Sequence, residues 1–325
     1  MKLLLLIIST ACLHAATNPP VAPVPVPNSP YLPRIYRYVD TLLEDPKQTT
    51  NLHQHQNFLR LLYTLTELST KPKYRDAADA ALRTWLDNVP SSDDKITRPW
   101  ILWNRCFEIA REPSTKFALA IVRNQITNHL GFYLRTCSAA YAHTTNAVFL
   151  QAIETLLKPF ENSKAAPTLS FAIDCDGCAQ ILPEPMAFRL RALAERVEIA
   201  PGAKASPETA MMYVSRYENS GKVTYRDALH AAANDNLNFS PADDISPLTL
   251  GHAISLQLAA WRSTARQSHL DKARALADLA LTKFFDGTTP EIGPGLDTLA
   301  LSLVELHLHI LYITAVRYPP NTLDR

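Results

Sequence analysis

Hydrophobic residues recur at intervals of three and four along most of the chain. The spacing is clearest in residues 55–68, and it returns in 115–126, 147–160, 186–197, 248–261, 270–285 and 296–315. Residues at these intervals share one face of an α-helix, because the helix has 3.6 residues per turn. No convincing run alternates with the period of two that is typical of strands. The pattern therefore predicts an all-α protein of about a dozen helices.

A faint internal repeat lies between these helical segments. Each copy follows one predicted helix and opens another, so each marks the turn of an antiparallel α-hairpin. The aromatic residues of the first three copies, Tyr74, Phe149 and Tyr225, are 75 and 76 residues apart, a distance that suits two hairpins. The copies are Thr70–Ala77, Thr145–Ala152, Lys222–Ala228 and, more loosely, Arg266–Ala273. This repeat predicts stacked helical pairs.

Composition and charge exclude several classes of function. The chain has 8 Gly and 24 Pro in 325 residues, whereas average usage would give roughly 23 Gly. It contains neither a G-x-G-x-x-G sequence nor a Walker A sequence, so nucleotide-phosphate chemistry of those kinds is not expected. The 32 Lys+Arg balance 31 Asp+Glu, which is not the basic footprint of a nucleic-acid-binding protein. We expect no nucleic-acid partner and no cofactor.

The first 33 residues are predicted to serve export and spacing. Residues 1–16 combine Lys2, a short apolar run and a small-residue site at Ala15 and Ala16, which is typical of a signal peptide. The run is shorter than a membrane span, so we expect a secreted or periplasmic protein without one. Lipid anchoring through Cys12 is the alternative, although Ser9 stands where lipoprotein signals usually carry Leu. Residues 17–33 are proline-rich and predict an extended spacer.

The remaining segment, 34–325, resembles the α/α-toroid domains of secreted carbohydrate-active proteins. The likeness rests on the repeated order of helix, Thr/Ser turn and aromatic-Leu/Arg-Asp/Gln-x-Ala at the start of the next helix. These families include polysaccharide lyases, six-hairpin glycosidases and sugar epimerases. The resemblance implies antiparallel α-hairpins that form a closed or incomplete toroid, and it implies a fold more than an activity.

The sharpest candidate for chemistry is the cluster from Asn128 to Arg135. Its Asn-His-x-x-aromatic-Tyr order resembles the Asn-His-Gly-x-Trp-Tyr motif of alginate-lyase-like toroids, although Leu130 replaces the Gly and Phe132 replaces the Trp. The resemblance implies that Asn128 masks a uronate carboxylate and that His129 abstracts the neighbouring proton. The alternative is that Asn128 and His129 merely end a helix and that Gly131 is a left-handed cap.

Other residues are candidates for completing this site. A tyrosine would protonate the leaving oxygen, and Tyr133 competes for that role with Tyr213, Tyr217 and Tyr225. We expect Arg135 to bind the acid group of the substrate.

A second group of candidates lies earlier in the chain. Trp100 and Trp103 lie three residues apart, on one helix face near Arg105, and so form a candidate sugar platform. Packing between helices is the alternative for this stripe.

The remaining polar and sulfur motifs carry weaker signals. Asp174 and Asp176 are candidates for an acid and base pair across a site. Cys175 and Cys178, three residues apart without a second ligand pair, indicate buried helix cysteines or a local disulfide. Two i, i+2 histidine pairs point to opposite helix faces, so we expect no metal site.

These observations leave three hypotheses for function. The first is an exported polysaccharide lyase, or otherwise a glycoside hydrolase, that acts on a polysaccharide or oligosaccharide. The second is a catalytically degenerate toroid that binds a glycan or a protein. The third is a helical-repeat scaffold without cavity chemistry.

Overall fold

The computed structural model describes residues 29–45, 55–69, 71–89, 100–163, 165–199, 204–242, 244–286 and 295–315. The predicted signal peptide and residues 17–28 of the predicted spacer lie outside these ranges. Within them the prediction of an all-α protein is confirmed, since they contain fourteen α-helices and no strand. No helix among these residues is long and apolar enough to cross a membrane.

The helices account for most of the described chain. They are α2 (Tyr31–Glu44), α4 (Gln56–Ser69), α5 (Pro72–Leu86), α6 (Trp100–Ile109), α7 (Arg111–Arg123), α8 (Leu130–Thr144), α9 (Ala147–Glu161), α10 (Leu169–Ala179), α11 (Glu184–Ala194), α12 (Pro207–Ser220), α13 (Val223–Asp235), α14 (Pro247–Thr264), α15 (Gln267–Ala280) and α16 (Leu296–Ala315). A 3-10 turn, η2 (Asn236–Asn238), follows α13, and a π-helical turn, η3 (Leu281–Phe285), extends α15.

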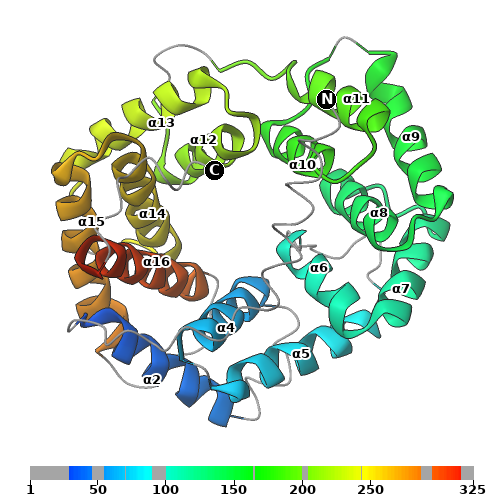
Figure 1. Cartoon of the computed structure of the whole chain (residues 1–325). Helices are drawn as coiled ribbons and strands as arrows, with labels where there is room; N and C mark the ends of the chain where they lie inside the picture. Colours follow the sequence, from blue (N-terminus) through cyan, green and yellow to red (C-terminus); the bar gives the residue numbers. More distant parts are fainter. Residues whose placement is uncertain are drawn as a thin grey trace.

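Figure 1 shows these helices in two rows around a ring. We call α4, α6, α8, α10, α12, α14 and α16 the inner helices, and α2, α5, α7, α9, α11, α13 and α15 the outer helices. Each of the four repeat segments joins an inner helix to the outer helix that follows it: α4 to α5, α8 to α9, α12 to α13 and α14 to α15. The two helices of each pair pack together. The last helix, α16, packs against α2 and α4, so the end of the described chain meets its beginning.

Local sequence signals explain where several helices begin and end. α12 and α14 begin at Ser-Pro sequences, where Ser206 and Ser246 accept hydrogen bonds from the backbone N–H groups of Thr209 and Thr249 at 3.2 and 3.1 Å. α2 begins at Tyr31, inside the predicted spacer, and Pro33 lies in its first turn, where a missing N–H costs nothing.

The repeat turns use left-handed backbone with little glycine. Thr145, Gly221 and Ala265 end α8, α12 and α14 with φ of 56°, 67° and 55°. Two of these three turns thus place a residue with a side chain at positive φ, where glycine is usual. The low glycine content of the chain therefore does not mean that its turns avoid positive φ.

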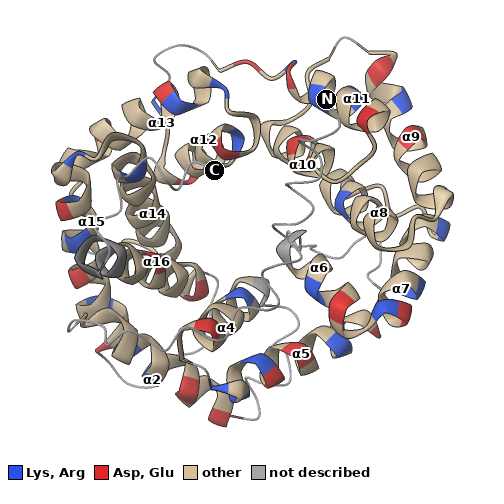
Figure 2. Ribbon diagram, viewed as in Figure 1, with Lys and Arg blue, Asp and Glu red and all other residues tan. Residues whose placement is uncertain are grey.

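The inner helices are joined to one another by ion pairs. Arg135 on α8 binds Asp174 on α10, and Asp176 on α10 binds Arg216 on α12. Arg262 on α14 then bridges two carboxylates, on α12 and α16. Figure 2 shows charged residues of both signs on inner and outer helices alike. The first two pairs are buried, so separating either one would leave an unpaired charge in the interior. Each pair therefore fixes the register of two neighbouring inner helices.

Candidate functional site

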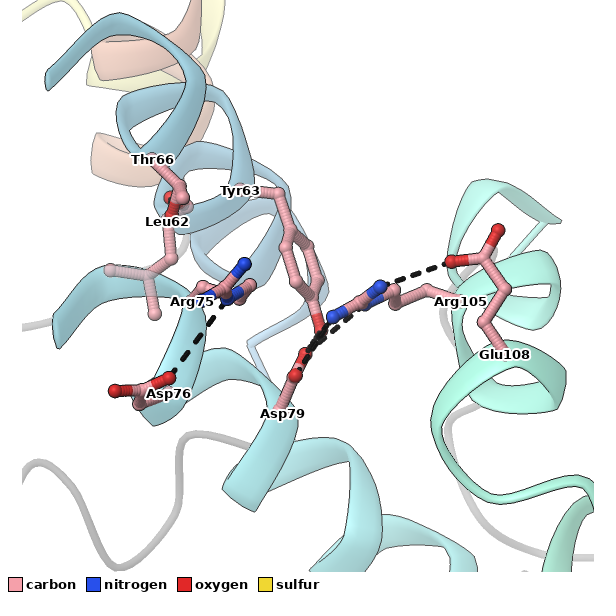
Figure 3. Close-up of polar contacts among 8 residues, drawn as sticks. All are labelled: Leu62, Tyr63, Thr66, Arg75, Asp76, Asp79, Arg105 and Glu108. Carbon is pink, nitrogen blue, oxygen red and sulfur yellow. Dashed lines mark hydrogen bonds and ion pairs between the residues drawn. The ribbon is translucent and has the colours of Figure 1, made fainter. Parts of the chain in front are cut away.

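An open pocket of about 510 Å³ lies between α4, α5 and α6. Most of its lining side chains are polar or charged, and Figure 3 shows several of them converging from the three helices. The lining consists of Arg60, Tyr63, Thr64, Thr66, Glu67, Arg75, Leu102, Arg105 and Glu108. A concave space with a few convergent polar groups is the usual form of a ligand site.

The spacing of residues on α4 and α6 builds this pocket. Arg60, Tyr63, Thr64 and Glu67 recur at helical intervals on one face of α4, while Phe58, Leu62 and Leu65 bury other positions of that helix in the core. On α6, Leu102, Arg105 and Glu108 are three residues apart and line the opposite wall. The pocket thus uses the polar stripes of two amphipathic helices.

The pocket occupies an open joint of the ring. Among the described residues, every other pair of successive inner helices packs extensively, including α16 with α4, but α4 and α6 do not. α5 packs against both of them and forms the floor between them. The space is therefore a consequence of the separation of two neighbouring helices.

One wall of the pocket is a tightly connected polar network. The Tyr63 hydroxyl donates to Asp79 Oδ1 at 2.7 Å, and Arg105 binds Asp79 with two nitrogens, its Nη2 lying 2.8 Å from Oδ2. Arg105 Nη1 also donates to Glu108 Oε2 at 3.0 Å, and its guanidinium lies 5.4 Å from the centre of the Tyr63 ring. Burial and the bond to Asp79 raise the pKa of Tyr63, so it remains a neutral phenol. This network holds Arg105 rigidly in place.

The other charged groups of the pocket keep their hydrogen-bonding capacity. The side chains of Arg60 and Glu67 make no hydrogen bond or ion pair with another described residue, and that of Arg75 has only a 3.9 Å contact with its neighbour Asp76. Burial lowers the pKa of Arg60, while the charges of Glu305 and Asp297 oppose that shift. Two guanidinium groups and one carboxylate of the pocket lining therefore keep free donor and acceptor positions.

The predicted sugar platform is divided by the structure. Arg105 lines the pocket, and its hydrogen bonds to Asp79 and Glu108 already occupy most of its donors. The side chain of Trp100 lies outside the described part of the chain. Trp103 is completely buried, with ring centres 5.3 to 6.5 Å from Trp85, Phe107, Phe117 and Phe132. Trp103 therefore packs between helices, which was the alternative interpretation, and presents no ring face to a ligand.

The cluster around His129 lies at the start of α8 and lines no part of the described pocket. Asn128 is exposed, and His129 is partly buried, with an Nε2 atom that is inaccessible and has no hydrogen-bond partner among the described residues. Burial raises the pKa of Tyr133 to about 12. Arg135 is buried and binds Asp174 at 2.5 Å, so it is not available to a substrate. Asn128, His129 and Tyr133 lie together at this helix end, and their catalytic roles stay predictions.

Gly131 differs from the expectation of a left-handed cap. It lies in the first turn of α8, outside the residues with positive φ. An added Cβ would lie 1.8 Å from Asp174 Oδ2. Glycine is required at this position because the carboxylate passes directly over the backbone.

Asp174 and Asp176 do not form an acid and base pair across a site. Each is buried and binds a different arginine, Arg135 and Arg216 respectively. Arg216 also donates to the carbonyl of Ala194 at 3.0 Å. Both aspartates therefore connect helices, and the expectation of paired carboxylates at these positions was wrong.

Packing also accounts for Cys175, Cys178, Tyr213 and Tyr225. Cys175 and Cys178 are buried free thiols, so the alternative of a local disulfide was wrong. The Tyr225 hydroxyl donates to the Val197 carbonyl at 3.1 Å, and Tyr213 is buried beside it. No group of three or more His, Cys, Asp or Glu within the described ranges is placed to hold a metal ion.

No family model matches the chain, and neither a curated protein nor a solved structure gives a match. Sequence reasoning missed Arg60, Tyr63 and Arg75. The first two lie on the polar stripe of α4, but such a stripe does not distinguish a pocket lining from a solvated helix face.

Proposed function

We propose that the chain folds as an (α/α) toroid and binds an acidic glycan in the pocket between α4, α5 and α6. Three features support the toroid: the two rows of helices, the inner-to-outer pairing and the contact of α16 with α2 and α4. The pairing accounts for the repeat segments, since each copy is a turn between an inner and an outer helix. Export of the mature chain, predicted from residues 1–16, fits an extracellular ligand.

The observation that carries the glycan proposal is the pair of open guanidinium groups in the pocket. Arg60 and Arg75 offer forked donors that match a carboxylate, and Glu67 accepts hydrogen bonds from sugar hydroxyl groups. Tyr63 supplies an aromatic body whose hydroxyl is already satisfied by Asp79, so its ring can contact the apolar face of a sugar. An oligosaccharide that contains uronate residues offers carboxylates to the arginines, hydroxyl groups to Glu67 and an apolar ring face to Tyr63.

Binding is tested by titrating the protein with oligouronates and with neutral oligosaccharides of equal length. We expect the acidic series to bind and Arg60→Gln to weaken its affinity by about ten- to a hundredfold, the value of a charge-assisted hydrogen bond. Arg83→Gln is the matched control, since Arg83 is exposed in the last turn of α5 and does not line the pocket. Equal affinity of the wild type and Arg60→Gln would place the ligand elsewhere. Absence of all binding would favour a helical-repeat scaffold.

Turnover of an acidic glycan at the start of α8 is a separate prediction. It rests on the resemblance of the cluster from Asn128 to Tyr133 to the alginate-lyase-like motif, and it requires a second site, because His129 lines no part of the pocket and its Nε2 atom must become accessible to take a proton. Ultraviolet absorbance of unsaturated uronates follows the reaction, and His129→Ala should abolish it. Binding without a signal would mean a toroid that recognises the glycan but does not cleave it.

A further inference from the structure

A serine and a histidine outside the pocket form a short hydrogen bond. Ser263 lies in the last turn of α14, and His230 lies on α13, which packs against it. Ser263 Oγ is 2.5 Å from His230 Nε2 and 3.2 Å from the carbonyl oxygen of Ala260. The imidazole is therefore the closer partner of the hydroxyl, and both side chains are partly exposed.

The surroundings of His230 favour its neutral form, because two arginines lie near it. Burial lowers the pKa of His230, and Arg226 and Arg266 act in the same direction. Asp227, one turn earlier on α13, opposes them and would stabilise an imidazolium ion. From α15, His269 also faces this region, and it is fixed by a 2.7 Å bond to Gln257. A neutral imidazole is the form that accepts a proton.

Arg266 gives the pair a cation that is free to act on a ligand. It directly precedes α15 and is exposed, and among the described residues its side chain makes no hydrogen bond or ion pair. Arg226, by contrast, binds Asp227 at 3.1 Å. Positive groups placed beside a nucleophile stabilise the negative oxygen that develops during acyl transfer.

We propose that Ser263 and His230 are a nucleophile and base pair that hydrolyses small carboxylic esters, with Arg266 beside the developing oxyanion. Ser263 Oγ forms a bond to the acyl carbon while its proton passes to His230 Nε2. The ester C–O bond breaks, and the leaving alcohol takes that proton. Water then attacks the acyl group, gives a proton to His230 and releases the carboxylic acid, and the proton returns to Ser263. This site is independent of glycan binding.

A fluorophosphonate probe tests the proposal on the full chain. Ser263 Oγ should displace fluoride from phosphorus, and peptide mass spectrometry should find the adduct on Ser263. His230→Gln removes the base and should slow labelling by about 10²–10⁴-fold. Ser215→Ala is the control, because Ser215 bonds only a helix carbonyl, that of Met211, at 3.1 Å. Absence of an adduct on Ser263, or labelling at an unchanged rate in His230→Gln, would overturn the proposal.

A second variant keeps the proposal testable if loss of the hydroxyl disturbs folding. Ser263→Cys retains a nucleophile, and a neighbouring base should give its thiol an alkylation rate that depends on His230. We expect rapid reaction with iodoacetamide near neutral pH, and slower reaction once His230→Gln is added. An alkylation profile identical in the two variants would show that the hydrogen bond is only structural.

Discussion

Replacing Gly131 by alanine is expected to destabilise the protein by about 2–4 kcal/mol. The new methyl carbon would lie 1.8 Å from Asp174 Oδ2 and 2.8 Å from its Cγ, far closer than atoms approach. The carboxylate must therefore rotate away from Arg135, although both side chains are only 5–6% exposed. Breaking such a buried pair costs about 3–5 kcal/mol, and the better helix propensity of alanine returns about 1 kcal/mol.

A double-mutant cycle isolates this effect. Denaturant unfolding would give the stability of the wild type, Gly131→Ala, Asp174→Ala and the double variant. Once Asp174 is absent the methyl group has room, so the second substitution should cost nothing. Gly177→Ala is the matched control, because it is also helical, on the neighbouring α10, and has no atom within 4 Å of the added carbon. Additive effects of the two substitutions would refute the steric argument.

Three further predictions concern stability. Gly221→Ala should cost about 1 kcal/mol, because φ is 67° there, whereas Gly177→Ala should gain about 0.5–1 kcal/mol; equal effects in denaturant unfolding would contradict this contrast. Burial lowers the pKa of His307, so the protein loses stability as the pH falls below about 6.5, where this imidazole must be kept neutral. His307→Leu should reduce the slope of the unfolding free energy against pH by up to about 1.4 kcal/mol per pH unit in this range, and an unchanged slope would count against the reasoning. Trp103→Ala should lose about 3–5 kcal/mol while glycan affinity stays the same, which titration of the folded variant would check.

The apolar spacing predicted several helices closely. The runs 55–68, 147–160 and 296–315 agree with α4, α9 and α16, and both α4 and α9 keep a face with exposed polar side chains. α8 is different, since residues 132–140 are all buried and contact neighbours on every side. A helix packed in this way shows little periodicity, and tertiary contacts decide its environment.

The same packing explains why candidate residues on α8 and α6 were misinterpreted. Arg135 and Trp103 are residue types that bind ligands when they are exposed, and their side-chain chemistry says nothing about burial. Arg135 is buried only because α10 places Asp174 opposite it, and that pairing joins residues 39 positions apart. A contact between distant helices has no signal within either helix.

The pocket also depends on how the helices are placed relative to one another, but here on the separation of two helices rather than on their contact. The polar stripe on α4 is what any solvated helix face shows, so sequence alone treats Arg60 and Glu67 as ordinary surface residues. They line a pocket because α6 stands apart from α4 while α5 packs against both. Elsewhere in the ring the inner helices touch, and there Arg135 and Arg216 are paired with carboxylates of a neighbouring inner helix. Where α4 and α6 separate, no carboxylate of the facing helix pairs with Arg60 among the described residues, and its charge stays open for the ligand that we propose.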